Sequence, residues 1–138
     1  MNQILSAYLE WDLHLVARKF AFIEKDALKE LTQEIGAADL ERIAKSMDLA
    51  SIMPLSAGKE DDESLLRAVL TIARQSGFIV RTFKDKGKRR IIIQHDLGAK
   101  WSRFYRMQVD QILKLRTHEI LLDATDNSLM ISTNLSSL

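Results

Sequence analysis

The chain of 138 residues contains no cysteine and only one proline. Without cysteine it has no disulfide framework, no thiolate nucleophile and no zinc ribbon. It also lacks an apolar run long enough to span a membrane, and it does not open with a basic segment followed by a hydrophobic stretch. We therefore expect a cytoplasmic protein without disulfides and without a membrane segment.

What is present is the composition of a folded protein, with 46% hydrophobic and 28% charged residues. This balance excludes extensive disorder, and the length suits one domain. The net charge of +1 conceals two unlike regions. Residues 1–63 contain 7 Lys or Arg against 13 Asp or Glu, whereas residues 81–106 contain 9 against 2. The asymmetry could attract an anionic partner or the acidic half of a second copy.

Apolar residues recur at helical spacing in four segments of the first half of the chain. The predicted helices cover residues 2–19, 24–35, 40–47 and 62–75. We expect Gly36 to end the second helix, Asp39 to cap the third, and residues 56–63 to form a loop. The chain is divided into an N-terminal helix, 1–20, and an α+β domain, 21–138.

From residue 78 onward the apolar pattern changes to the alternation that is typical of strands. The predicted elements are strands at 78–84, 89–95, 119–123 and 128–133, a turn at 85–88 and a helix at 99–115. Helices over 24–75 followed by this β-β-α-β-β unit over 78–133 predict an α+β fold. We expect one antiparallel sheet, covered on one face by the helices at 62–75 and 99–115.

The most distinctive motif is the junction between the second strand and the last helix, residues 95–102. Asp96 is expected to cap the helix, and the positive end of the helix would keep His95 neutral. A neutral imidazole can be structural, can contact a ligand or partner, or can serve a hydrolase-type enzyme with Ser102 or Asp96. The residues expected in a ligand or partner site are His95, Asp96, Gly98, Lys100, Trp101 and Ser102.

Neither a metal site nor a cofactor nor a catalytic residue is expected. No cluster of His, Asp or Glu has the spacing of metal ligands, and His14 and His118 are distant from His95 in the sequence. Ser102 lacks the glycine-flanked elbow of a nucleophilic serine, and Gly98 is too isolated for a phosphate-binding loop.

An alternative function is nucleic-acid binding through the hairpin at 84–90 and the helix at 100–114. The cations concerned are Lys84, Lys86, Lys88, Arg89, Arg90 and Arg103. The competing interpretation is a solvated hairpin whose charges prevent sheet edges from aggregating. No aromatic residue interrupts the turn, and Phe83 is expected to face the core, which favours the solvated hairpin.

The first predicted helix carries large apolar side chains close to the start of the chain. They are Ile4, Tyr8, Trp11 and Leu15, which share one helical face. Two interpretations are equally favoured: packing against the helical half of the same chain, or a homodimer interface, where Trp and Tyr are common anchors.

Two blocks of residues carry a family resemblance. The first comprises Asn2-Gln3-Ile4-Leu5 and Tyr8-Leu9-Glu10-Trp11-Asp12; the second comprises Ile93-Gln94-His95-Asp96-Leu97-Gly98, Lys100-Trp101-Ser102, Phe104-Tyr105 and Thr125-Asp126-Asn127-Ser128. With these blocks the chain resembles a group of uncharacterised archaeal proteins that are most common in ammonia-oxidising archaea. The resemblance implies a transcription regulator with an N-terminal ribbon-helix-helix unit and a C-terminal α+β part.

The chain departs from that pattern, since it starts inside a helix of the ribbon-helix-helix unit. We expect either a truncated start or the loss of the DNA-reading strand, and therefore no direct sequence-specific DNA binding. The function expected is that of a non-enzymatic regulatory domain that senses a ligand or binds a partner, forms a homodimer and is linked to transcription regulation.

Overall fold

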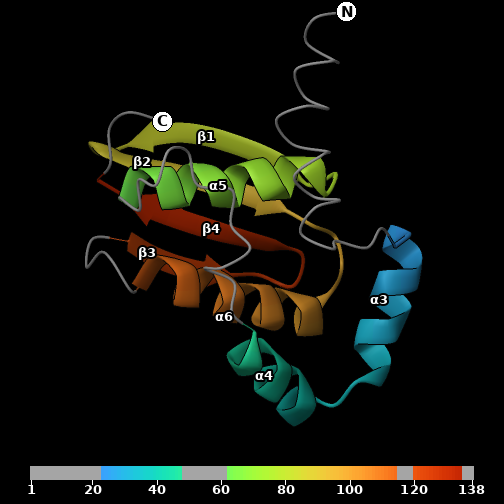
Figure 1. The fold of residues 1–138 in the computed structure, drawn as a ribbon. Helices are drawn as coiled ribbons and strands as arrows, with labels where there is room; N and C mark the ends of the chain where they lie inside the picture. The colour runs from blue at the N-terminus through green and yellow to red at the C-terminus, as the bar shows by residue number, and fades with distance from the viewer. Residues whose placement is uncertain (1–22, 48–61, 115–119, 135–138) are drawn as a thin grey trace, which may run out of the picture.

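The computed structural model describes residues 23–47, 62–114 and 120–134. Figure 1 shows helices packed against a four-stranded sheet. The elements are α3 (Lys25–Glu34), α4 (Ala37–Ser46), α5 (Asp62–Gln75), β1 (Ile79–Asp85), β2 (Lys88–Gln94), α6 (Ala99–Lys114), β3 (Ile120–Ala124) and β4 (Ser128–Thr133). The α+β class is confirmed. The expected helix at 1–20 and most of the expected loop at 56–63 lie outside the described residues.

All strands of the sheet pair antiparallel, in the order β1-β2-β4-β3. Two hairpins, β1–β2 and β3–β4, are joined through α6, so that β2 and β4 meet in the centre of the sheet. Lys86 and Gly87, which connect β1 to β2, have φ angles of 50° and 79°. Two consecutive positive φ angles define a type I′ turn, whose twist matches that of the flanking strands. The predicted antiparallel sheet is confirmed.

Helices α5 and α6 cover one face of the sheet (Figure 1). Because side chains alternate along a strand, the register places Ile91 and Ile93 of β2 on this face, beside Ile131 and Leu129 of β4. All four side chains are fully buried. The helices complete this core with Leu65, Leu66, Val69, Leu70, Tyr105, Val109, Ile112 and Leu113. Each buried aliphatic side chain stabilises the fold by roughly 1.5–3 kcal/mol, so the fold rests on this layer.

A smaller cluster attaches α4 to the outer side of α6. It consists of the buried side chains Leu40, Ala44 and Phe104. Trp101, in the first turn of α6, packs against both this cluster and the main core. The indole therefore joins the two parts of the hydrophobic interior.

Lys100 ties α3 to the start of α6. Its Nζ donates hydrogen bonds to the backbone oxygens of Gln33, at 2.6 Å, and Ile35, at 3.0 Å. These oxygens lie at the C-terminal end of α3, where carbonyl groups lack helical partners and the helix dipole favours a cation. The ammonium of Lys100, expected at a ligand site, is here bound to the main chain of α3.

Two local expectations are wrong. Phe83 does not face the core: its side chain is 44% exposed, because the register pairs it with Arg90 on the face of the sheet opposite the helices. Asp39 does not cap α4, because the helix already begins at Ala37 with Gly36 in the cap position, which leaves Asp39 inside the first turn.

Replacing Lys100 by Met should loosen α3 while leaving the sheet intact. The variant loses two charge-assisted hydrogen bonds, which are together worth on the order of 2 kcal/mol. Hydrogen exchange measured by NMR should show faster exchange of the α3 amides and unchanged exchange in β2 and β4. Arg106→Met, an exposed change on the same helix, is the control. Equal protection of α3 in both variants would contradict the role given to Lys100.

Candidate functional site

The junction between β2 and α6 is a sharp corner with two positive φ angles. Asp96 has a φ of 60° and Gly98 a φ of 89°. Between them, Leu97 is only 1% exposed. Glycine adopts positive φ without steric cost, and aspartate tolerates it better than most residues. The corner lets the chain leave Gln94 as a strand and begin a helix at Ala99.

His95 lies at the centre of this corner and has no contact with solvent, since its exposed fraction is 0%. Its Nδ1 accepts a hydrogen bond of 3.0 Å from the backbone N–H of Leu97. The proton of the neutral ring is therefore on Nε2, which has no hydrogen-bond partner among the described residues. Burial lowers the pKa of His95 from 6.5 to about 4, against a smaller opposing effect of Asp96 and with a small contribution from Lys25. The ring is neutral, as expected, but burial is the main cause.

Aromatic side chains enclose the imidazole. Phe78 and Tyr105 each place their ring centroid 6.2 Å from that of His95, edge to face. Trp101 in turn stacks on Tyr105, with the ring planes 15° apart. Burial raises the pKa of the Tyr105 phenol, so this group also stays neutral. The corner is a hydrophobic aromatic cluster with polar atoms embedded in it.

The corner is bound to the turn between β3 and β4 through Asn127. The backbone oxygen of Asn127 accepts from the N–H of His95 at 2.9 Å and from that of Asp96 at 3.2 Å. Its side-chain Oδ1 accepts from the N–H of Gly98 at 3.1 Å. Three amides of the corner are thus bonded to one residue of the opposite hairpin. Sequence reasoning did not assign this role to Asn127; the only signal was its place in the second block of the family resemblance.

Ser102 forms the second connection to the same turn. Its hydroxyl donates to the backbone oxygen of Thr125 and also lies 3.3 Å from the backbone oxygen of Ser128. The side chain is 1% exposed. A serine whose proton is directed at a carbonyl oxygen, away from solvent, is placed to hold two elements together rather than to attack a substrate.

Asp96 does not cap α6 as expected. Its two carboxylate oxygens accept hydrogen bonds from the Gln94 amide nitrogen, at 3.0 and 3.2 Å. The first amide that the cap would have bonded, the N–H of Gly98, is taken by Asn127. Asp96 is exposed, so of the six predicted site residues it offers the most accessible polar group.

The structure therefore brings the six predicted residues together, but mostly in contacts within the protein. His95 and Ser102 are buried, Lys100 binds α3, and Trp101 packs against two hydrophobic clusters. No group of three or more His, Cys, Asp or Glu side chains that could hold a metal ion occurs in the part of the chain that the structure describes.

The basic residues proposed for nucleic-acid binding do not share one face. By the strand register, Lys84 and Arg89 point to the helical side of the sheet, whereas Lys88 and Arg90 point to the opposite side. Arg103 lies on α6, which covers the helical side. The cations of the hairpin are therefore divided between the two sides of the sheet, and only some of them lie on the side of Arg103.

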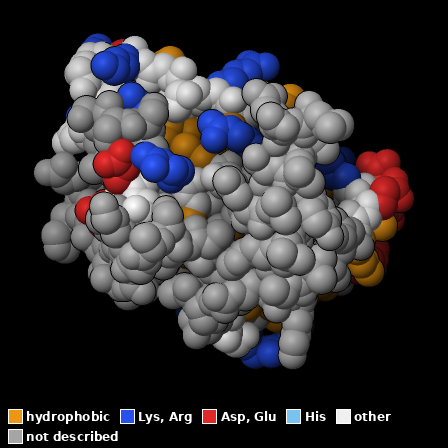
Figure 2. Space-filling view, turned by 45° about the horizontal axis from the view of Figure 1, so that its top comes forward, with side chains coloured by type: hydrophobic (Ala, Val, Ile, Leu, Met, Phe, Trp, Pro, Cys, Tyr) orange, Lys and Arg blue, Asp and Glu red, His pale blue; other side chains and the backbone are white. Residues whose placement is uncertain are grey.

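The face of the sheet opposite the helices is not covered by any element within the described residues. We call it the open sheet face. On β1 and β2 it carries the apolar residues Ile79, Phe83 and Ile92, the cations Arg81, Lys88 and Arg90, and also Asp85 and Gln94. Ile79 is 49% and Phe83 44% exposed, and Leu121 on β3 is 66% exposed. On the side of the molecule that it turns toward the viewer, Figure 2 also shows hydrophobic side chains between Lys and Arg side chains. Apolar and cationic groups thus alternate on an accessible surface.

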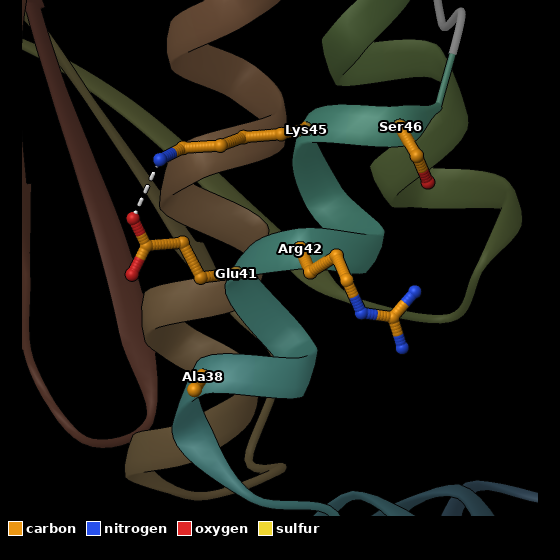
Figure 3. A pocket seen from close by; sticks show the side chains of 5 residues that line it. All are labelled: Ala38, Glu41, Arg42, Lys45 and Ser46. Atoms are coloured by element: carbon orange, nitrogen blue, oxygen red, sulfur yellow. Dashed lines mark hydrogen bonds and ion pairs between the residues drawn. The ribbon is translucent and has the colours of Figure 1, made fainter.

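A surface hollow of about 480 Å³ lies on α4 (Figure 3). Its lining consists of Ala38, Glu41, Arg42, Lys45 and Ser46. Glu41 and Lys45 point toward each other and form an ion pair of 2.7 Å, and Arg42 points away from them. The charged side chains that line the hollow thus pair with each other or point outward. None of the lining residues offers a buried polar group that could bind a ligand.

The predicted dimer residues Ile4, Tyr8, Trp11 and Leu15 lie outside the described residues. No family model, curated protein or solved structure matches this chain. Among the described residues no helix is both long and apolar enough to cross a membrane.

The burial of His95 predicts a specific loss of stability in mild acid. In the unfolded chain the imidazole takes up a proton near pH 6.5, whereas in the folded protein it does so only near pH 4. The unfolded state binds more protons between these values, so the free energy of unfolding falls as the pH drops from 6.5 to 4, by about 3 kcal/mol in total.

Urea unfolding of the protein and of His95→Asn at pH 7, 6 and 5 measures this effect. Asparagine can accept the hydrogen bond from Leu97 but does not titrate, so the free energy of unfolding of the variant should fall less between pH 7 and pH 5. At pH 7 the variant should be less stable than the unmodified protein, because the packing of the imidazole ring is lost. If the free energy of unfolding of both proteins fell equally with pH, the titration of His95 would not be the cause of the loss of stability.

Proposed function

We propose that this chain is a non-enzymatic nucleic-acid-binding domain that uses the open sheet face. The observation that carries the proposal is the exposed position of Phe83 beside Arg81 and Arg90, on a face that none of the described helices and strands covers. An aromatic ring among cations on an accessible surface is a combination typical of proteins that bind single-stranded nucleic acids. The absence of such an aromatic residue was the main sequence argument against this function.

Charge supports an anionic partner. The strands and turn from Ile79 to Gln94 contain six Lys or Arg and one Asp. On the open sheet face the cations are Arg81, Lys88 and Arg90, and the acids are Asp85, which pairs with Arg90 at 3.1 Å, and Asp123 on β3. The positive charge of this face therefore predominates only on its β1–β2 side. A dense polyanion gains affinity from each such cation by releasing counterions.

The geometry of the junction favours binding over catalysis. His95, the candidate general base, is sealed among aromatic rings, and the hydroxyl of Ser102 is directed at Thr125. A general base must reach the proton that it abstracts, directly or through one water. In our proposal the junction between β2 and α6 has a structural role, and the open sheet face binds the nucleic acid.

We also propose that the domain takes part in transcription regulation. The resemblance to archaeal transcription regulators favours a domain that works beside a DNA-bound complex. A homodimer formed through Ile4, Tyr8, Trp11 and Leu15 would then present two open sheet faces. In this arrangement the domain needs no ribbon-helix-helix strand of its own to contact nucleic acid.

Fluorescence anisotropy with labelled 20-nucleotide DNA, single-stranded and duplex, tests the proposal. Arg81→Ala combined with Lys88→Ala should weaken binding about tenfold at 50 mM salt and reduce the slope of log K against log salt by roughly 1.4. The control is Arg103→Ala combined with Arg106→Ala, an equal charge change on α6, which should reduce affinity less. Absence of binding at low salt, or an equal loss in both double variants, would overturn the proposal.

A further inference from the structure

The open sheet face has a defined order of side chains across its four strands. The cross-strand register aligns Phe83, Arg90, Ser132 and Leu121 in one row, from β1 to β3. A second row begins with Arg81, continues with Ile92 and Met130, and ends with Asp123 on β3. Side chains directly opposite each other lie about 5 Å apart, and those two positions apart on one strand about 7 Å apart.

This surface is too broad for the groove of a duplex. Four strands spaced about 4.8 Å apart span roughly 14 Å before side chains are counted, whereas the major groove of B-DNA is about 12 Å wide and admits a helix or a two-stranded ribbon. The β1–β2 hairpin is not a free ribbon, because β2 also pairs with β4 along its length. The open sheet face therefore cannot enter the groove as a flat surface.

An unpaired strand fits the same surface. Its bases are free to stack on aromatic rings, which is the principal way in which proteins bind single strands without reading a groove. Phe83 offers an accessible ring, and Ile79 lies on the same face of β1, 49% exposed. Arg90 is already paired with Asp85, so contacts with phosphates fall to Arg81 and Lys88, both of which are exposed.

Resting on the proposed function, we infer that the open sheet face binds single-stranded nucleic acid, with one base stacked on Phe83 and phosphates against Arg81 and Lys88. The strand crosses the β1–β2 side of the sheet, where the cations are. The far side of the sheet, around Leu121, is exposed but has no cation on β3, and it contributes little.

The test compares single-stranded and duplex DNA of the same 20-nucleotide sequence, with Phe83 replaced by Leu or by Trp. Phe83→Leu keeps an apolar side chain but removes the ring, and it should weaken single-strand binding by roughly 5- to 100-fold while changing duplex binding little. Phe83→Trp should retain the affinity, with quenching of the added indole fluorescence on binding. Leu121→Ala removes an exposed apolar side chain from the same row and should leave single-strand affinity unchanged.

The outcomes separate this inference from the proposed function. If the unmodified protein binds neither form of DNA at low salt, the proposed function fails and the inference fails with it. If both forms bind equally and Phe83→Leu has no effect, the inference alone is overturned. If Phe83→Leu instead converts a dimer to a monomer in sedimentation without DNA, the face is a protein interface, and the inference is also overturned.

Discussion

The connection between Asn127 and the β2–α6 corner is the interaction on which the rest of the structure depends. Two antiparallel hairpins make one sheet only if the chain can cross over through α6 and return in register. The backbone and side-chain oxygens of Asn127 accept hydrogen bonds from the amides of His95, Asp96 and Gly98, and Ser102 binds the same turn. These bonds determine where α6 starts, and thereby where Trp101 and Tyr105 meet the core.

Much of this fold could be predicted because it follows from local patterns. Alternation of apolar residues marked the strands, the Lys86-Gly87 turn marked the first hairpin, and helical spacing marked α5 and α6. What could not be predicted depends on contacts between residues far apart in the sequence. The N–H of Gly98 was expected to be capped by Asp96, two residues away, but its partner is Asn127, 29 residues further along the chain.

The orientation of Phe83 shows the same limit in another form. Its strand has apolar residues on both faces, Val80 on one and Ile79 and Phe83 on the other, so alternation alone cannot decide which face is buried. Only the pairing with β2, where Ile91 and Ile93 are buried, determines the outcome. The candidate site changed for this reason: His95 was the most conspicuous residue in the sequence, whereas the accessible chemistry lies on the other face of the sheet.

The bonding of Asn127 to the corner has a further consequence for recognition. Because the two hairpins are connected at both the sheet and the corner, the open sheet face is held in one shape before any partner arrives. A strand binding there would lose its own conformational freedom while the protein loses little, so the entropy of the ligand would govern affinity. Stiff strands with strongly stacked bases would therefore bind differently from flexible ones, so that the surface would distinguish strands by their backbone flexibility without any hydrogen bond that reads a base.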